Sequence, residues 1–240
     1  MKNLFKLMFI TIFTMFSLNL LGNEKEYVVG TNAEYPPFEY IENGVITGFD
    51  AELIQLIAEK AGFKYKWSNM NFDGLIPAIQ SNKIDIVIAG MSITPERSKA
   101  VNFSIPYLTS KAAFVTNKKN PIKGLDDLEN KKYGAELGTT KEATARKIKG
   151  AEVVPFSNNT AALVALKNGK VDGIVMDESV AKKYAEANSE DLIYVGAVEG
   201  EPKAIGFNKS NNELKEKVDK AIQELLDDGT IEKMKEKYGI

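Results

Sequence analysis

The apolar residues of this chain fall into two kinds of pattern that alternate along the sequence. Short continuous runs, such as 86–89, are rich in valine and isoleucine, which is typical of strands that are covered on both faces. Between the runs, apolar residues recur at the spacing of one helix face, as in 50–61, where Asp50 is the predicted N-cap and Gly62 the predicted end. Strands that alternate with such helices predict an α/β fold with mainly parallel sheets.

The same reasoning, applied along the whole chain, gives a set of predicted elements. Asn43-Gly44 predicts the turn of a hairpin between 38–41 and 45–49. The segments 101–107 and 112–115 are predicted to be extended segments that cross between two units. The predicted strands are 27–31, 63–67, 84–89, 133–137, 153–156, 171–176, 192–195 and 204–207, and the predicted helices are 50–61, 75–79, 140–148, 160–167, 179–187, 213–226 and 230–238.

The stretch 84–97 combines a buried strand with the start of a further helix. Gly90 permits a turn or a close approach of the backbone, Thr94 is the predicted helix cap and Pro95 fits the first helical position. Arg97 would then lie in the first turn, where the helix dipole disfavours a cation. An anion between the helix N–H groups and the guanidinium would explain this placement, and a carboxylate fits best. The alternative is an arginine that points into water.

Two segments of the chain resemble each other. Residues 78–85 and 165–172 both follow an apolar helix and lead into a buried strand, so we expect two similar α/β lobes with the ligand site in the cleft between them. Two ordinary helix-to-strand turns would look the same. Sites in such folds lie beyond the carboxyl ends of strands, and that is where the sequence places Asn32, 90–92, 138–140 and Asp177.

Composition narrows the range of functions. The 240 residues carry a net charge of −2, which gives no indication of nucleic-acid binding. The chain has no cysteine and no histidine, so disulfides, thiol catalysis and the commonest general base and metal ligand are excluded. We therefore predict a protein without catalytic residues, metal or cofactor.

The N-terminal segment 1–23 has the pattern of a secretory signal peptide. Lys2 and Lys6 form a positive region, and the apolar run that follows is about 15 residues long, too short to span a membrane comfortably. A signal anchor is the alternative. The end of the segment also looks like a lipoprotein signal, but Asn23 stands where the lipidated cysteine would be. We expect export across the cytoplasmic membrane without lipidation at this position.

Together, these motifs resemble the periplasmic polar-amino-acid-binding proteins of ABC importers, solute-binding protein family 3. The resemblance covers nearly the whole chain after the signal peptide. It implies a two-lobe periplasmic-binding-protein-like fold of type II, with lobe 1 formed by 24–110 plus 204–240 and lobe 2 by 111–203, and with crossings near 108–114 and 200–206. The motifs that carry it are 30–39, 48–53, 72–78, Asp85, 89–94, Arg97, 137–140, Asp172, 177–178, 228–230 and 237–238.

The resemblance also implies how the main chain of an amino acid would be held. Arg97 would clamp the α-carboxylate, because a planar fork suits a planar anion, with help from Ser92 and the N–H groups around Thr139 and Thr140. Asp177 would hold the α-ammonium with the Gly90 carbonyl and the Ser92 hydroxyl. Because the cation and the anion lie in different lobes, a bound zwitterion would favour closure of the cleft.

The positions that match the side-chain pocket point in two directions. Tyr35 and Phe72 match residues that sandwich the ligand side chain, and the alternative for both is core packing. Asn32 replaces an aspartate that is common in basic-amino-acid binders, whereas Glu136 stands where the glutamine binder has a lysine. Ala89 and Gly90 are similar to the glutamine and arginine binders rather than to the histidine binder. Glu34 and Glu39 are expected to be solvated, and the alternative is that they add negative potential near the pocket.

We therefore expect a periplasmic binding protein for arginine or lysine, with glutamine as the next candidate. It would act as a monomer and deliver the amino acid to an ABC permease in the membrane. Two alternatives remain at this point: an enzyme on the same fold, of the dehydratase type that acts on precursors of aromatic amino acids, and a ligand-sensing module for a signalling receptor.

Overall fold

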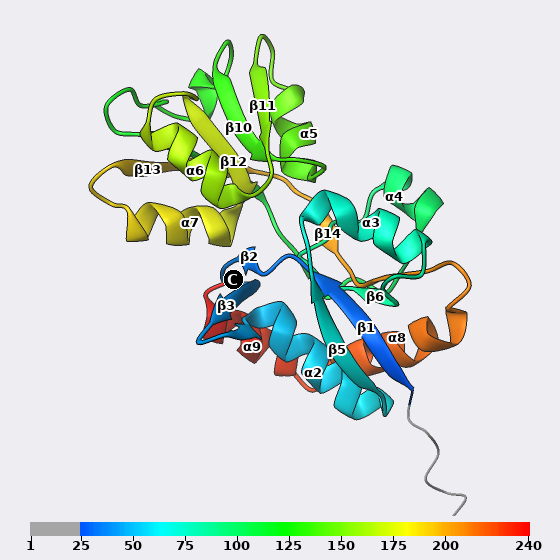
Figure 1. Cartoon of the computed structure of the whole chain (residues 1–240). Coiled ribbons are helices and arrows are strands. Elements are labelled where there is room, and N and C mark those ends of the chain that lie inside the picture. The colour runs from blue at the N-terminus through cyan, green and yellow to red at the C-terminus, as the bar shows by residue number, and fades with distance from the viewer. Residues whose placement is uncertain (1–24) are drawn as a thin grey trace, which may run out of the picture.

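The computed structural model describes residues 25–240, which form two lobes that each contain a five-stranded sheet (Figure 1). The predicted signal peptide lies outside these residues. In the first lobe the strand order is β5-β1-β6-β15-β7. The strands are β1 (Glu26–Thr31), β5 (Lys64–Asn69), β6 (Ile86–Val87), β15 (Gly206–Phe207) and β7 (Asn102–Phe103). The helices are α2 (Phe49–Ala61), α3 (Phe72–Gln80), α4 (Pro95–Ala100), α8 (Asn212–Asp227) and α9 (Thr230–Tyr238).

The second lobe has the strand order β11-β10-β12-β9-β13. Its strands are β9 (Ala112–Asn117), β10 (Lys132–Glu136), β11 (Glu152–Phe156), β12 (Gly173–Asp177) and β13 (Leu192–Val198). Its helices are α5 (Thr140–Arg146), α6 (Asn159–Lys167), α7 (Glu178–Ala187) and the short 3-10 helix η2 (Leu125–Asp127).

Apolar residues cover both faces of the first sheet, as the sequence pattern predicts. Ile86 of β6 packs in a cluster with residues of α2 and α8, whereas its neighbour Val87 packs in a cluster with residues of α3. Both side chains are buried. Strand β6 is shorter than the predicted strand 84–89, although the flanking residues Ile84, Ile88 and Ala89 are also buried. The continuous apolar run therefore indicates that both faces of the sheet are buried at this strand, but it does not give the length of the strand.

Both sheets are mixed rather than mainly parallel. In the first sheet β1 runs parallel to β5 and β6, and β15 runs antiparallel to β6 and β7. In the second sheet β10 runs parallel to β11 and β12, and β9 runs antiparallel to β12 and β13. The prediction that 112–115 is a crossing segment is wrong, because β9 bonds on both sides within the second sheet and is buried along its length.

The crossing between the lobes is a pair of antiparallel strands, β8 (Leu108–Thr109) and β14 (Pro202–Lys203). Figure 1 shows β14 between the two lobes, and it shows α9 returning to the side of α2 in the first lobe. Lys237 of α9 forms an ion pair of 2.5 Å with Glu52 of α2, and the Tyr238 hydroxyl donates to the same carboxylate at 2.6 Å. The C-terminal segment is thus packed on the first lobe.

The turn at Asn43-Gly44 depends on neighbouring residues alone, and the structure confirms its prediction. Strands β3 (Glu39–Glu42) and β4 (Val45–Thr47) form the expected hairpin, and Asn43 and Gly44 both have positive φ, at 52° and 79°. This is the conformation for which Asn-Gly is favoured in a two-residue turn. The short strand β2 (Glu34–Tyr35) pairs with β3 at the other edge.

The prediction that Asp50 caps α2 is wrong. The helix begins after Gly48, and the Asp50 carboxylate makes no cap. It accepts instead from the Gly90 N–H at 2.6 Å and from the Tyr107 hydroxyl at 3.0 Å. Asp50 thereby ties α2 to the loop that follows β6. Among residues 25–240, no helix is long and apolar enough to cross a membrane.

Candidate ligand-binding site between the lobes

A pocket lies between the two lobes, and residues from both of them line it. Every residue that the sequence predicts for a ligand site is in its wall, together with three that were not predicted, Glu39, Lys141 and Lys203. The predicted residues that the structure brings together are Asn32, Tyr35, Phe72, Ala89, Gly90, Ser92, Arg97, Glu136, Thr139, Thr140 and Asp177.

Arg97 is positioned by the start of α4, as the sequence predicts. The Thr94 hydroxyl accepts from the Arg97 N–H at 3.2 Å, and Pro95 takes the first position of the helix. The guanidinium donates to the Ser92 carbonyl at 2.7 Å and to the Gly138 carbonyl at 2.9 Å. It also lies over the Phe72 ring, 5.1 Å from the centroid.

The guanidinium of Arg97 is largely buried, with 9% of the residue exposed, so the alternative of an arginine in open water is wrong. Burial lowers its pKa to about 10, and the group therefore stays positively charged at neutral pH. Within residues 25–240 no ion pair joins it to a carboxylate: its two hydrogen bonds go to carbonyl oxygens. A buried cation that lacks an anionic partner is a strong attractor for one.

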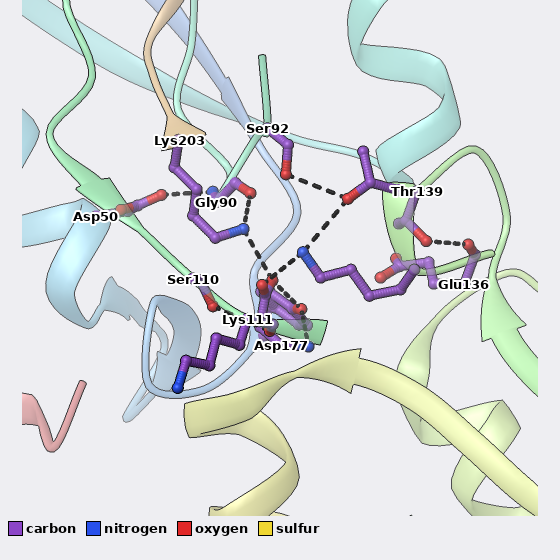
Figure 2. Close-up of polar contacts among 12 residues, drawn as sticks. Asp50, Gly90, Ser92, Ser110, Lys111, Glu136, Thr139, Asp177 and Lys203 are labelled. Atoms are coloured by element: carbon purple, nitrogen blue, oxygen red, sulfur yellow. Dashed lines mark hydrogen bonds and ion pairs between the residues drawn. The ribbon is translucent and has the colours of Figure 1, made fainter. Parts of the chain in front are cut away.

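Asp177 is at the end of β12, and it is buried; Figure 2 shows it beside Lys203. Lys141 Nζ lies 2.6 Å from Oδ1, and Lys203 Nζ lies 2.8 Å from Oδ2. The Tyr35 hydroxyl donates to Oδ2 at 2.6 Å. Burial alone would raise the pKa of Asp177, but the charges of Lys141 and Lys203 outweigh it and hold the pKa below its ordinary value. Asp177 is therefore ionised.

Glu136 is at the end of β10 and is a different kind of carboxylate. Its Oε2 accepts from Asn159 Nδ2 at 2.6 Å, whereas Oε1 is buried and has no hydrogen-bond partner among the described residues. Burial raises its pKa to about 8, although the Asn159 bond opposes this, and the charges of Glu34 and Asp73 add to the increase. A cation placed beside Oε1 would satisfy the oxygen and favour its ionised form.

The three residues that sequence reasoning missed are all buried and charged. Lys141 lies in the first turn of α5, so the argument that singled out Arg97 would have found it as well. Burial lowers the pKa of Lys141 to about 8, although Asp177 opposes this decrease. Lys203 is in the crossing strand β14, 1% exposed, and no local pattern signals its partners.

The expectation that Glu39 is solvated is wrong, because only 1% of it is exposed, whereas Glu34 is exposed as expected. Burial and then the charge of Asp50 raise the pKa of Glu39 well above its ordinary value. The sequence neighbours of Glu39 are apolar and aromatic, and such neighbours do not by themselves distinguish a buried acid from an exposed one.

Polar contacts in the pocket wall join the two lobes directly. The Arg97 guanidinium of the first lobe reaches the Gly138 carbonyl of the second, and Tyr35 reaches Asp177. The hydroxyls of Ser92 and Thr140 lie 3.2 Å apart. The arrangement therefore offers a cation from one lobe and carboxylates from the other, with aromatic faces between them.

Comparison with known proteins agrees with this geometry. Residues 27–240 match the family of bacterial extracellular solute-binding proteins, family 3. A probable histidine-binding protein of Campylobacter jejuni is 39% identical over 213 residues, which cover 88% of this chain and 83% of that protein. The arginine-binding extracellular protein ArtP of Bacillus subtilis is 36% identical over 228 residues, which cover 90% of this chain and 87% of ArtP.

Solved structures show the same fold. An ancestral arginine-binding protein bound to arginine superposes with a TM-score of 0.83 at 45% identity, covering 89% of this chain and 97% of that one. The same ancestral protein bound to glutamine gives the same TM-score and coverage. All of these matched proteins are named as binding proteins. The chain belongs to the bacterial extracellular solute-binding proteins, family 3.

Proposed function

We propose that this protein captures a basic L-amino acid, arginine or lysine, outside the cytoplasmic membrane and delivers it to an ABC permease, with glutamine as the next candidate ligand. One observation carries the proposal. Among residues 25–240, the pocket has a buried cation without a carboxylate partner in one lobe, Arg97, and a buried carboxylate with an unpartnered oxygen in the other, Glu136. An α-carboxylate suits the first group and a cationic side chain suits the second.

The main chain of the ligand is assigned as follows. Its carboxylate binds the fork of Arg97, with Ser92 and the first residues of α5, Thr139 and Thr140, around it. Its ammonium binds the Asp177 carboxylate. Charge-assisted hydrogen bonds contribute about 1.5–3 kcal/mol each, so several of them, less the cost of ordering and closure, are enough for sub-micromolar binding.

The side chain of the ligand extends towards Glu136 between Tyr35 and Phe72. The pKa of about 8 means that Glu136 is poorly stabilised as an anion by the protein itself. A guanidinium or ammonium group supplies that stabilisation, whereas the neutral amide of glutamine supplies only a hydrogen bond. Asn32 adds a neutral amide to the pocket wall and does not compete for the charge.

Closure of the lobes follows from the placement of charge. With 24–110 and 204–240 as lobe 1 and 111–203 as lobe 2, only a closed cleft brings both ends of the ligand into contact with their partners. The ligand therefore favours the closed state by its differential affinity. We further propose that the protein is a periplasmic monomer without enzymatic activity, exported by the signal peptide 1–23.

Calorimetric titration with the twenty amino acids and ornithine tests the proposal. The protein is first unfolded and refolded, so that any co-purified ligand is removed. Tight binding of arginine or lysine is expected, with weaker binding of glutamine. Binding of no amino acid would overturn the proposal, and turnover of prephenate or arogenate would assign the pocket to an enzyme instead.

A further inference from the structure

Lys203 occupies the groups that the proposed function assigns to the ammonium of the ligand. Its Nζ donates to the Gly90 carbonyl at 2.5 Å and to Asp177 Oδ2 at 2.8 Å. The Gly90 carbonyl and the Asp177 carboxylate are two of the three acceptors that the family resemblance implies for an α-ammonium, and the Ser92 hydroxyl is the third. The chain therefore carries a primary ammonium of its own at the position where an amino acid would place one (Figure 2).

Lys203 lies in the crossing strand β14, at the boundary of the segment 111–203 proposed as lobe 2, and its backbone is bonded to residues of the first lobe. Its carbonyl accepts from the Tyr107 N–H at 3.0 Å, and it bridges to Ser92 as an isolated β-pair. The neighbouring Ala204 N–H donates to the Met91 carbonyl at 3.0 Å. From this fixed position the side chain crosses to Asp177 at the end of β12 in the second lobe, so the ion pair spans the two lobes.

The side chain is also held along its length. Lys203 is 1% exposed, and its Nζ lies 5.5 Å from the centroid of the Phe38 ring. An ammonium group in such a place depends on its acceptors for charge compensation, and Asp177 supplies the direct ion pair. Two ammonium groups cannot share the same oxygen lone pairs without repulsion, so Lys203 and a ligand ammonium compete.

We propose that Lys203 is an internal stand-in for the ligand ammonium: it links the two lobes in the free protein, and the ammonium of the amino acid displaces it from Asp177. The inference rests on the proposed function for the identity of the competitor. It assigns to Lys203 a role in affinity, because an arriving ammonium gains only the difference between its own bonds and those that Lys203 gives up.

Lys141 provides the matched comparison. It is equally close to Asp177, at 2.6 Å from Oδ1, and it is 4% exposed. However, it belongs to α5 in the second lobe, the same lobe as Asp177. Its ion pair therefore neutralises the carboxylate without joining the lobes. Replacement of either lysine by methionine removes the same charge from the same partner, and only one of them removes a link between lobes.

The first arm of the experiment measures shape. Small-angle scattering on the refolded protein, without amino acid, compares wild type, K203M and K141M. A larger radius of gyration is expected for K203M alone, because the lobes lose the ion pair that joins them and keep only the weaker contacts of Tyr35, Arg97 and Ser92. Equal radii for K203M and wild type would overturn the proposal. Circular dichroism checks folding, and K203Q, which keeps a polar contact with Gly90 but no charge, replaces K203M if the latter does not fold.

The second arm measures competition with a pair of ligands that differ in one group. Arginine and 5-guanidinopentanoate share the carboxylate and the guanidinium, but only arginine has the ammonium. K203M should bind arginine on the order of tenfold more tightly than wild type does, and its preference for arginine over 5-guanidinopentanoate should grow by a similar factor.

An unchanged or smaller preference in K203M would show that Lys203 does not compete with the ammonium, and a weaker affinity for arginine would show that the lysine supports the ligand instead. If neither compound binds to any variant, the proposed function fails, and the scattering arm still decides whether Lys203 links the lobes.

Discussion

The two lobes share one topology but place different charged residues beside the cleft. The strand order β5-β1-β6-β15-β7 in the first corresponds element by element to β11-β10-β12-β9-β13 in the second. The repeated segments 78–85 and 165–172 lie at equivalent places, since one leads from α3 to β6 and the other from α6 to β12. The internal resemblance in the sequence therefore marks a real structural repeat.

The correspondence extends to single atoms. Asp85 accepts from the Val28 N–H at 2.9 Å through its side chain, and Asp172 accepts in the same way from the Lys132 N–H at 2.7 Å. Each aspartate thus ties the strand that it precedes, β6 or β12, to the neighbouring strand, β1 or β10. The residues three positions before these aspartates, Asn82 and Gly169, both adopt positive φ, at 57° and 66°.

The difference between the lobes lies in the charged residues at equivalent positions. The second residue of the first α-helix is Asp50 in α2 of the first lobe and Lys141 in α5 of the second. Arg97 belongs to α4, which follows β6 in the first lobe, whereas Asp177 is the last residue of β12 in the second. In the proposed function, this repeated framework presents Arg97 to one end of a zwitterion and Asp177 to the other.

Of the substitutions that test this difference between the lobes, Asp177→Ala should have the largest effect, and it acts on the stability of the protein. It leaves Lys141 and Lys203 buried without their carboxylate, and removal of one partner of a buried ion pair costs about 3–5 kcal/mol. Chemical denaturation should show a decrease of this size in the free energy of unfolding. The triple variant D177A/K141M/K203M should recover much of the loss; no recovery would contradict the view that the uncompensated charges cause it.

Arg97→Ala should follow in size, and it acts on the ligand rather than on the fold. Loss of the bidentate clamp should weaken amino-acid binding by about 100-fold or more, as measured by calorimetry. Arg146→Ala is the matched control, because Arg146 pairs with Glu142 on the exposed face of α5 and is not in the pocket. Equal affinity of R97A and wild type would show that the first lobe does not recognise the carboxylate through Arg97.

Glu136 should make the binding of arginine depend on pH. Its pKa of about 8 is raised above the ordinary value, and a cationic ligand requires the ionised form. As pH falls below about 8, proton removal must accompany binding, so affinity should fall by up to about tenfold per pH unit. Calorimetry at about pH 6, 7 and 8 should show this trend together with proton release.

Glu136→Gln should flatten the pH profile of arginine binding and weaken the binding by about tenfold at pH 8, while it affects glutamine less. A profile that stays steep in E136Q would assign the titration to another group. Lys141, whose pKa is also lowered to about 8, is the group to examine next.

The turn before β12 should show the smallest effect. Gly169 has φ of 66° and open space around its Cα, so Gly169→Ala introduces backbone strain without a clash and should cost about 1 kcal/mol in thermal or chemical unfolding. Gly169→Asn should cost less, because Asn82 adopts the same conformation in the first lobe. Equal costs for both variants would mean that the two turns are not equivalent.

Local interactions explain what could be predicted from the sequence. Thr94 and Pro95 specify the start of α4 through residues three positions apart, and Asn43-Gly44 specifies its hairpin, so both were predicted correctly. The placement of Arg97 in a helical first turn was sufficient to indicate an anion site. The other predicted residues are far apart in the sequence, so local interactions could not place them in one pocket. Their placement there was predicted from the motifs that resemble the family.

The errors concern residues whose partners are far away in the sequence. Asp50 looks like a helix cap, but its carboxylate accepts a hydrogen bond from the N–H of Gly90, 40 positions later. Lys203 reaches Asp177 across 26 positions and across the cleft. Strand β9 has the apolar composition of a crossing segment as well as that of a central strand, and only its pairing with β12 and β13 distinguishes the two.

The central claim is that the two lobes recognise opposite ends of a basic amino acid, and a titration with arginine and citrulline tests it most directly. Citrulline has nearly the same shape as arginine but a neutral urea in place of the guanidinium, so the pair isolates the charge beside Glu136. The account predicts that, at about pH 8, arginine binds at least tenfold more tightly than citrulline to the wild type and that this preference largely disappears in E136Q. Equal binding of arginine and citrulline to the wild type would contradict it.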